Sequence, residues 1–233
     1  MTAMNLIVQP HAAYLITDTA YYLADGTVVE FAPKVTELNF GPLVAGPPAR
    51  AAFALTGIVS PDHVKAELAT VAAADMRDVL DVLPDIMRRL SSALPSAQRA
   101  PGVGSECDVL LALAMWDEAT GKPYGFLIGN EASNPVLKGQ MPPFQLTRMK
   151  HYVIGRATHG FPDGHDFSDP SRFDPISEGG ALLDDQRADP FGDDATQFTG
   201  VGGQGVLTQI GAAGIRYHLL RSWPDRVGER ISP

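Results

Sequence analysis

A threonine, an aspartate and a lysine stand at equal intervals near the start of the chain. Thr2 follows Met1, Asp18 comes sixteen residues after Thr2, and Lys34 comes sixteen residues after Asp18. Removal of Met1 would leave Thr2 with a hydroxyl group and a free α-amine that titrates near ~8. Such an amine could take the hydroxyl proton, so nucleophile and base would lie on one residue. A nearby lysine would keep the amine neutral, and a carboxylate would hold that lysine in place.

The segments that carry these residues have the patterns of β-strands. Short apolar runs rich in β-prone residues recur over the first part of the chain. Asp25-Gly26 lies between two of them, which predicts a hairpin because a type I′ turn needs positive φ at both central residues. Asp18 is therefore expected at the end of a strand, and Lys34 at the start of another. The predicted strands are residues 3–8, 13–17, 21–24, 27–31, 34–40 and 51–55.

Helical patterns follow these strands. Ser60-Pro61-Asp62 predicts a helix start, because it combines a capping hydroxyl, a proline in the first turn and an acid near the positive helix end. Residues 75–94 carry apolar side chains at helical spacing, with Pro84 at a position that could kink or divide the helix. Further strands are predicted at 109–116, 124–128, 206–210 and 215–220, with one or two in 144–154, and a short helix at 176–188.

This order of elements predicts the fold class. Along the chain, the predicted order is strands, helices, strands, one helix and strands. This order lacks the regular alternation of strand and helix that a doubly wound fold has. It fits two stacked sheets with helices outside, a four-layer α/β arrangement. The chain has 233 residues and no internal repeat or low-complexity linker, so we predict one domain over residues 1–233.

Composition and charge exclude several classes of partner. The chain is 45% hydrophobic and carries a formal charge of -9, which argues against nucleic acid and anionic membranes as partners. No signal peptide and no uninterrupted apolar run of ~18 residues is recognised, so a cytoplasmic location is expected. The single cysteine, Cys107, forms no intramolecular disulfide and fits a reducing compartment.

The spacing of Thr2, Asp18 and Lys34 resembles that of proteasome β subunits and HslV-like peptidases, which are N-terminal-nucleophile (Ntn) hydrolases. The neighbouring residues resemble the same family. ITDT around Asp18 is similar to its strand-ending Ala-Asp-Ser, and residues 34–38, KVTEL, are similar to its Lys-Val-x-Glu-Ile. Residues 53–57, FALTG, resemble the strand that ends in the oxyanion-hole glycine, and the predicted helix from Ser60 follows. The resemblance covers residues 2–90 and is architectural beyond them.

The resemblance implies an αββα sandwich of two mainly antiparallel sheets flanked by helices. It implies that Thr2 attacks a carbonyl group, that Lys34 tunes the Thr2 amine, and that Asp18 orients Lys34. The Gly57 N–H would stabilise the oxyanion, a contribution typically worth ~3 kcal/mol. The implied reaction is hydrolysis of peptide or amide bonds without a cofactor or metal, and the implied assembly is a homo-oligomer, with a ring as one form.

The supporting residues of the family are matched less closely. Arg156 stands where the resemblance calls for a serine, and Thr158 is the candidate to replace that hydroxyl. Near the last strands, Thr199 is the candidate second hydroxyl and Asp194 the candidate acid.

Because these supporting residues match less closely, two other functions stay open. One is a catalytically inactive structural or assembly subunit, which retention of Met1 or a start at Met4 would favour. The other is an Ntn amidase that acts on a small molecule.

Three further segments have structural interpretations. The run of glycines between Gly200 and Gly205 is expected to be a turn that leads into a strand, because no lysine and no helix follow it. His159, Asp163, His165, Asp166 and Asp169 fit no zinc or calcium template, so a solvated loop is expected. The tail after Trp223 is expected to be too polar for the core.

Overall fold

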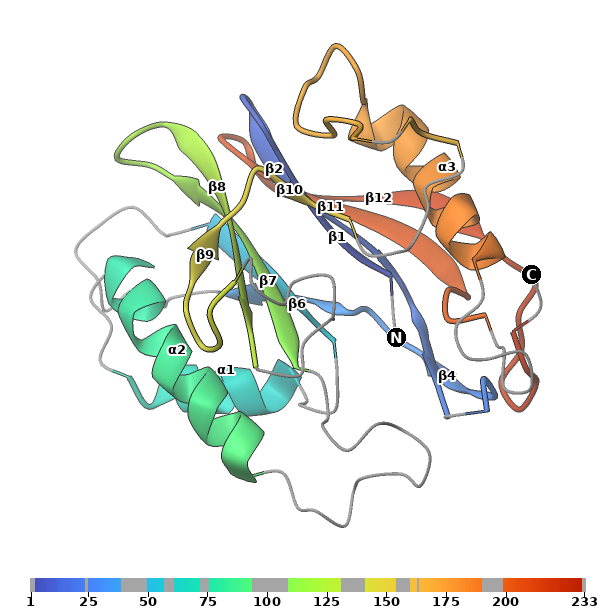
Figure 1. Ribbon diagram of the computed structural model, residues 1–233, viewed down its shortest axis with the longest axis horizontal. Helices are drawn as coiled ribbons and strands as arrows, with labels where there is room; N and C mark the ends of the chain where they lie inside the picture. Colours follow the sequence, from blue (N-terminus) through green and yellow to red (C-terminus); the bar gives the residue numbers. More distant parts are fainter. Residues whose placement is uncertain are drawn as a thin grey trace.

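Two five-stranded sheets stack face to face in the computed structural model, with helices on their outer faces (Figure 1). All strand pairs within them are antiparallel. The structure describes residues 3–23, 25–38, 50–56, 61–71, 76–93, 109–130, 141–153, 160–162, 164–189 and 199–231.

The first sheet has the strand order β10-β1-β2-β11-β12 and the second has the order β5-β6-β7-β8-β9. The first consists of β1 (Met4–Gln9), β2 (Ala12–Asp18), β10 (His151–Tyr152), β11 (Gln204–Gly211) and β12 (Gly214–Ser222). The second consists of β5 (Val35–Leu38), β6 (Arg50–Thr56), β7 (Leu110–Asp117), β8 (Lys122–Gly129) and β9 (Thr147–Arg148). The predicted hairpin forms β3 (Ala20–Tyr22) and β4 (Val28–Phe31), and Gly26 in its turn has φ 84°.

Alternation along the strands sorts apolar side chains into separate layers. On β2, Leu15 faces the second sheet, whereas Ile16 faces α3 (Pro175–Ala188) on the outside. On β6, Ala54 faces the first sheet, whereas Phe53 packs against α1 (Pro61–Ala69) and α2 (Met76–Ala93). The predicted four-layer αββα arrangement is therefore confirmed. Pro84 lies inside α2 and does not divide it.

The prediction that the tail after Trp223 is too polar for the core is confirmed for Pro224 and residues 226–230, which are exposed, but not for Ile231. Ile231 is buried and packs with Ala20 and Val28 under the β3–β4 hairpin. Asp225 is also buried, because the Arg187 guanidinium pairs with its carboxylate at 2.7 Å. A charged side chain can be buried when an opposite charge and hydrogen-bond donors replace its water, and here α3 supplies that partner.

The loop before α3 is anchored by aromatic side chains. Phe167 and Phe173 are buried and pack edge-on at 5.0 Å between ring centroids. The His165 ring lies 4.7 Å from that of Phe167, so this histidine belongs to an aromatic cluster and not to a solvated surface. In the part of the loop that the structure describes, no group of three or more His, Cys, Asp or Glu side chains could hold a metal ion. None of the described helices is long and apolar enough to cross a membrane.

Candidate active site

Asp18 and Lys34 form a buried ion pair. Lys34 Nζ lies 2.7 Å from Asp18 Oδ1, and the side chains are 4% and 0% exposed. Asp18 is the last residue of β2, and Lys34 directly precedes β5. The pair therefore joins the end of a central strand in one sheet to the beginning of an edge strand in the other. The structure thus brings together two of the residues that the sequence spacing singled out.

Among the described residues, three backbone N–H groups donate to the Asp18 carboxylate in addition to Lys34 Nζ. The N–H of Ala3 donates to Oδ1 at 3.1 Å, and the N–H groups of Ala20 and Gly202 donate to Oδ2 at 3.2 and 3.1 Å. Hydrogen bonds to an ionised acceptor are stronger than neutral ones. Asp18 therefore fixes the beginning of the chain, the β3–β4 hairpin and the glycine turn before β11 relative to Lys34.

Burial lowers the pKa of Lys34, and the charge of Asp18 and its hydrogen bond only partly oppose this effect. The ammonium group also lies 5.3 Å from the ring centroid of Tyr21, where a cation is attracted to the aromatic face. Lys34 is thus a cation whose surroundings bring its deprotonation closer to neutral pH. This property suits a residue that influences the protonation of a neighbouring group.

The stability of the fold is expected to rise with pH between the lowered pKa of folded Lys34 and the pKa of an unfolded lysine, about 10.4. An unfolded lysine holds its proton up to about pH 10.4, whereas folded Lys34 releases it at lower pH. Between these two pKa values the unfolded state binds more protons, so the free energy of unfolding increases with pH. Arginine stays charged throughout, so Lys34→Arg should remove this dependence. Urea unfolding at several pH values gives the slope of the free energy of unfolding against pH for the wild type and for Lys34→Arg. Equal slopes would contradict the prediction.

The glycine turn before β11 brings backbone donors to two carboxylates. Gly202 N–H donates to Asp18, and Gly203 N–H donates to Asp225 Oδ2 at 2.8 Å. The Thr19 hydroxyl accepts from the Gln204 N–H at 2.9 Å. The predicted glycine turn that leads into a strand is confirmed. Gly203 has φ 74°, a left-handed conformation that L side chains rarely adopt.

Gly203→Ala is expected to destabilise the protein by about 2–3 kcal/mol. Besides the strained φ, a Cβ at this position would lie 2.5 Å from Phe31 Cδ1 and 2.6 Å from Thr19 Oγ1. Gly121→Ala is the matched control, because Gly121 has φ 62° and open space around a Cβ. The control should cost only about 1 kcal/mol for the backbone strain. Urea unfolding compares the two, and equal losses would show that the close approach at Gly203 is unimportant.

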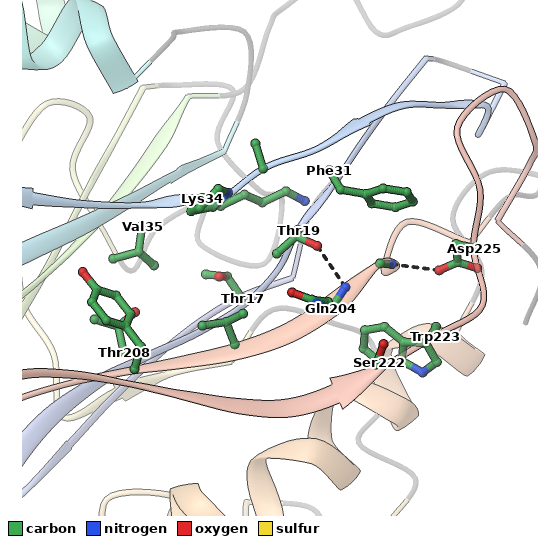
Figure 2. Close-up of a pocket in the computed structure, with 15 residues that line it drawn as sticks. Thr17, Thr19, Phe31, Lys34, Val35, Gln204, Thr208, Ser222, Trp223 and Asp225 are labelled. Atoms are coloured by element: carbon green, nitrogen blue, oxygen red, sulfur yellow. Dashed lines mark hydrogen bonds between the residues drawn. The ribbon is translucent and has the colours of Figure 1, made fainter.

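A pocket of about 660 Å³ lies beside the ion pair, between β5 and the β11–β12 pair. Figure 2 shows Phe31 and Trp223 at one end of it, Thr208 and Val35 at the other, and Lys34 between them. The remaining lining residues come from β2, β11, β12 and the segments that flank the strands. They are Thr17, Thr19, Ala32, Pro33, Gly203, Gln204, Val206, Tyr217, Ser222 and Asp225.

The other predicted site residues divide into two groups. Thr199 is 2% exposed and lies in the segment that leads to the glycine turn. The remainder lie outside the described residues: Thr2, Gly57, Arg156, Thr158 and Asp194. The sequence interpretation missed Gly202 as a partner of Asp18 and Arg187 as a partner of Asp225. Only the run of glycines could have pointed to Gly202, since it marks a close approach of backbone.

Comparison with solved structures identifies the architecture. The Anbu (Gly-1) mutant from Hyphomicrobium sp. strain MC1 matches with a TM-score of 0.61 and 13% identity, over 97% of this chain and 90% of that one. Anbu (ancestral beta-subunit) from Yersinia bercovieri matches with a TM-score of 0.55 and 10% identity, over 94% and 86%. A scan of protein-family models and a search of curated proteins gave no match. The chain therefore has the fold of these two Anbu structures, which is the αββα sandwich that the resemblance to Ntn hydrolases implied.

Proposed function

We propose that this protein is a threonine-type N-terminal-nucleophile hydrolase that cleaves peptide or amide bonds. The observation that carries the proposal is the buried Asp18–Lys34 pair, together with the hydrogen bond from Ala3 N–H to Asp18. Ala3 N is bonded to the carbonyl carbon of Thr2, and consecutive Cα atoms are ~3.8 Å apart. Thr2 directly precedes Ala3, so the proposal assigns the nucleophile to the residue next to this hydrogen bond.

The chemistry begins with loss of Met1. The Thr2 hydroxyl oxygen attacks the carbonyl carbon of the scissile amide, and its proton passes to the α-amine and then to the leaving nitrogen. Water then hydrolyses the resulting ester and frees the hydroxyl group for the next cycle. A positive charge on Lys34 disfavours protonation of the amine, and Asp18 holds Lys34 in place. The Gly57 N–H is assigned to the oxyanion.

Mass measurement and labelling test this proposal directly. The intact mass and the N-terminal sequence of protein from its own host should show Thr2 as the first residue. A β-lactone, which acylates activated hydroxyl groups, should then add one label per chain, and peptide mapping should place it on Thr2. Retained Met1 together with absent labelling would contradict the proposal, and would favour a structural subunit of the same fold.

The proposal includes assembly of several copies into a homo-oligomer, with a closed ring as the expected form. Two large apolar side chains two residues apart on β12 are exposed. Tyr217 and Leu219 are 54% and 63% exposed. Exposed apolar surface of this kind often marks a protein interface. A cytoplasmic location is also part of the proposal, supported by the single cysteine.

Leu219→Glu is expected to shift the protein toward the monomer. A buried carboxylate without a partner would oppose contact between two apolar surfaces. Size-exclusion chromatography with light scattering at matched concentrations measures the mass of both proteins. Lys150→Glu, a change at an exposed position away from β12, is the control that should leave the mass unchanged. A monomeric wild-type protein would contradict the assembly, while leaving the hydrolase proposal to the labelling experiment.

A further inference from the structure

The pocket beside Lys34 contains a buried hydroxyl group without a partner. Thr208 on β11 is 0% exposed, and its Oγ1 has no hydrogen-bond partner among the residues that the structure describes. Most buried polar atoms in folded proteins are paired, so an unpaired one calls for an explanation. Thr208 lines the pocket at the end opposite Phe31 and Trp223 (Figure 2). A ligand in the pocket would supply the missing partner.

The shape of the pocket indicates an elongated ligand. Gln204, Val206 and Thr208 alternate along β11, so they line one face of this strand over a length of roughly 14 Å. The volume of about 660 Å³ lies within the range of roughly 300–1,000 Å³ that is usual for small-molecule sites.

The charges around the pocket indicate an uncharged ligand. Lys34 is paired with Asp18 at 2.7 Å, and Asp225 is paired with Arg187 at 2.7 Å and accepts from Gly203 N–H. Each charged side chain that lines the pocket thus has an opposite charge beside it. A ligand ion would have to compete with these pairs and lose its own water. The rest of the wall is largely apolar, and includes Phe31, Pro33, Val35, Val206 and Trp223.

We propose that this pocket binds an elongated, uncharged and mainly apolar small molecule, and that an N–H or O–H group of this molecule donates to Thr208 Oγ1. This inference goes beyond the hydrolase proposal, because binding requires neither a free Thr2 amine nor any reaction. The ligand would enter past Phe31 and Trp223 and lie along β11, with Lys34 on the facing wall.

Two fluorescent probes that differ by one charged group test the proposal. N-phenyl-1-naphthylamine is neutral, apolar and elongated, and has one N–H group. 8-Anilinonaphthalene-1-sulfonate has the same skeleton with a sulfonate added. The neutral probe should bind saturably with one site per chain and receive energy from Trp223, and Trp223→Phe should reduce that transfer. The sulfonate should bind at least tenfold more weakly. Equal or tighter binding of the sulfonate would overturn the proposal.

Substitutions locate the site. Thr208→Val keeps the shape of the side chain and removes the hydroxyl, so the affinity for the neutral probe should fall about fivefold. The same change should raise the thermal midpoint of the free protein, because an unpaired buried hydroxyl is lost.

Val206→Phe should abolish binding by filling the pocket. Thr36→Val on β5 is the control, because Thr36 does not line the pocket. Thr2→Ala should leave binding unchanged, which separates this site from the hydrolase proposal. Unchanged binding in Thr208→Val would overturn the assignment even if Val206→Phe fails to fold.

Discussion

Thr2→Ala is expected to lower the rate of amide hydrolysis at least ~10³-fold and to abolish labelling by the β-lactone. Alanine at this position keeps the free α-amine after loss of Met1 but has no hydroxyl group to attack the carbonyl carbon. Within the described residues, Asp18 accepts hydrogen bonds from the backbone of Ala3, Ala20 and Gly202 and from Lys34. The variant should therefore keep this network and unfold at nearly the same urea concentration as the wild type.

Thr2→Ser is the matched control for the loss of the hydroxyl group. Serine keeps both the nucleophile and the amine, so hydrolysis and labelling should stay within about tenfold of the wild type. Rates are measured with a fluorogenic amide on protein whose N-terminus has been confirmed by mass. Full hydrolysis by Thr2→Ala would rule out Thr2 as the nucleophile. A folded, inactive Thr2→Ser would show that more than a hydroxyl group is required.

The strands and the ion pair could be predicted from the sequence because their signals are local. Alternating apolar residues and the Asp25-Gly26 turn place β1 to β4 within a few residues of their observed bounds. The resemblance of their spacing to that of proteasome β subunits then pointed to Asp18 and Lys34, whose side chains the structure brings to 2.7 Å. A strand that ends at Asp18 and another that begins after Lys34 make this contact possible, since each residue lies at a strand terminus.

The remaining partners of the site could not be predicted because they come from distant parts of the chain. Gly202 N–H reaches Asp18 across 184 positions in the sequence, and Arg187 on α3 reaches Asp225 across 38. Neither contact leaves a local pattern. The burial of the Asp225 side chain in particular depends on where α3 packs against the first sheet, which composition alone does not reveal. The pocket has the same origin, because its walls come from β5, β11 and β12.

Lys34→Met is expected to destabilise the protein by about 3–5 kcal/mol, because it leaves the Asp18 carboxylate buried without an opposite charge. The side chain of Asp18 is 0% exposed, so water cannot replace the lost ammonium group without a rearrangement of the site. Lys150→Met changes the same kind of residue at an exposed position and should shift the free energy of unfolding by less than about 0.5 kcal/mol. Urea unfolding gives both values.

A second substitution separates the buried charge from the loss of packing. Asp18→Asn in the Lys34→Met background removes the uncompensated charge, and its side-chain oxygen can still accept from Ala3 or Gly202. The double variant should therefore be more stable than Lys34→Met alone. The free energies of unfolding of the wild type, the two single variants and the double variant together give the coupling energy between the two side chains. Additive effects would mean that the two side chains stabilise the fold independently. Asp18 would then fix the beginning of the chain through its backbone partners, and Lys34 would be free to act on the neighbouring amine.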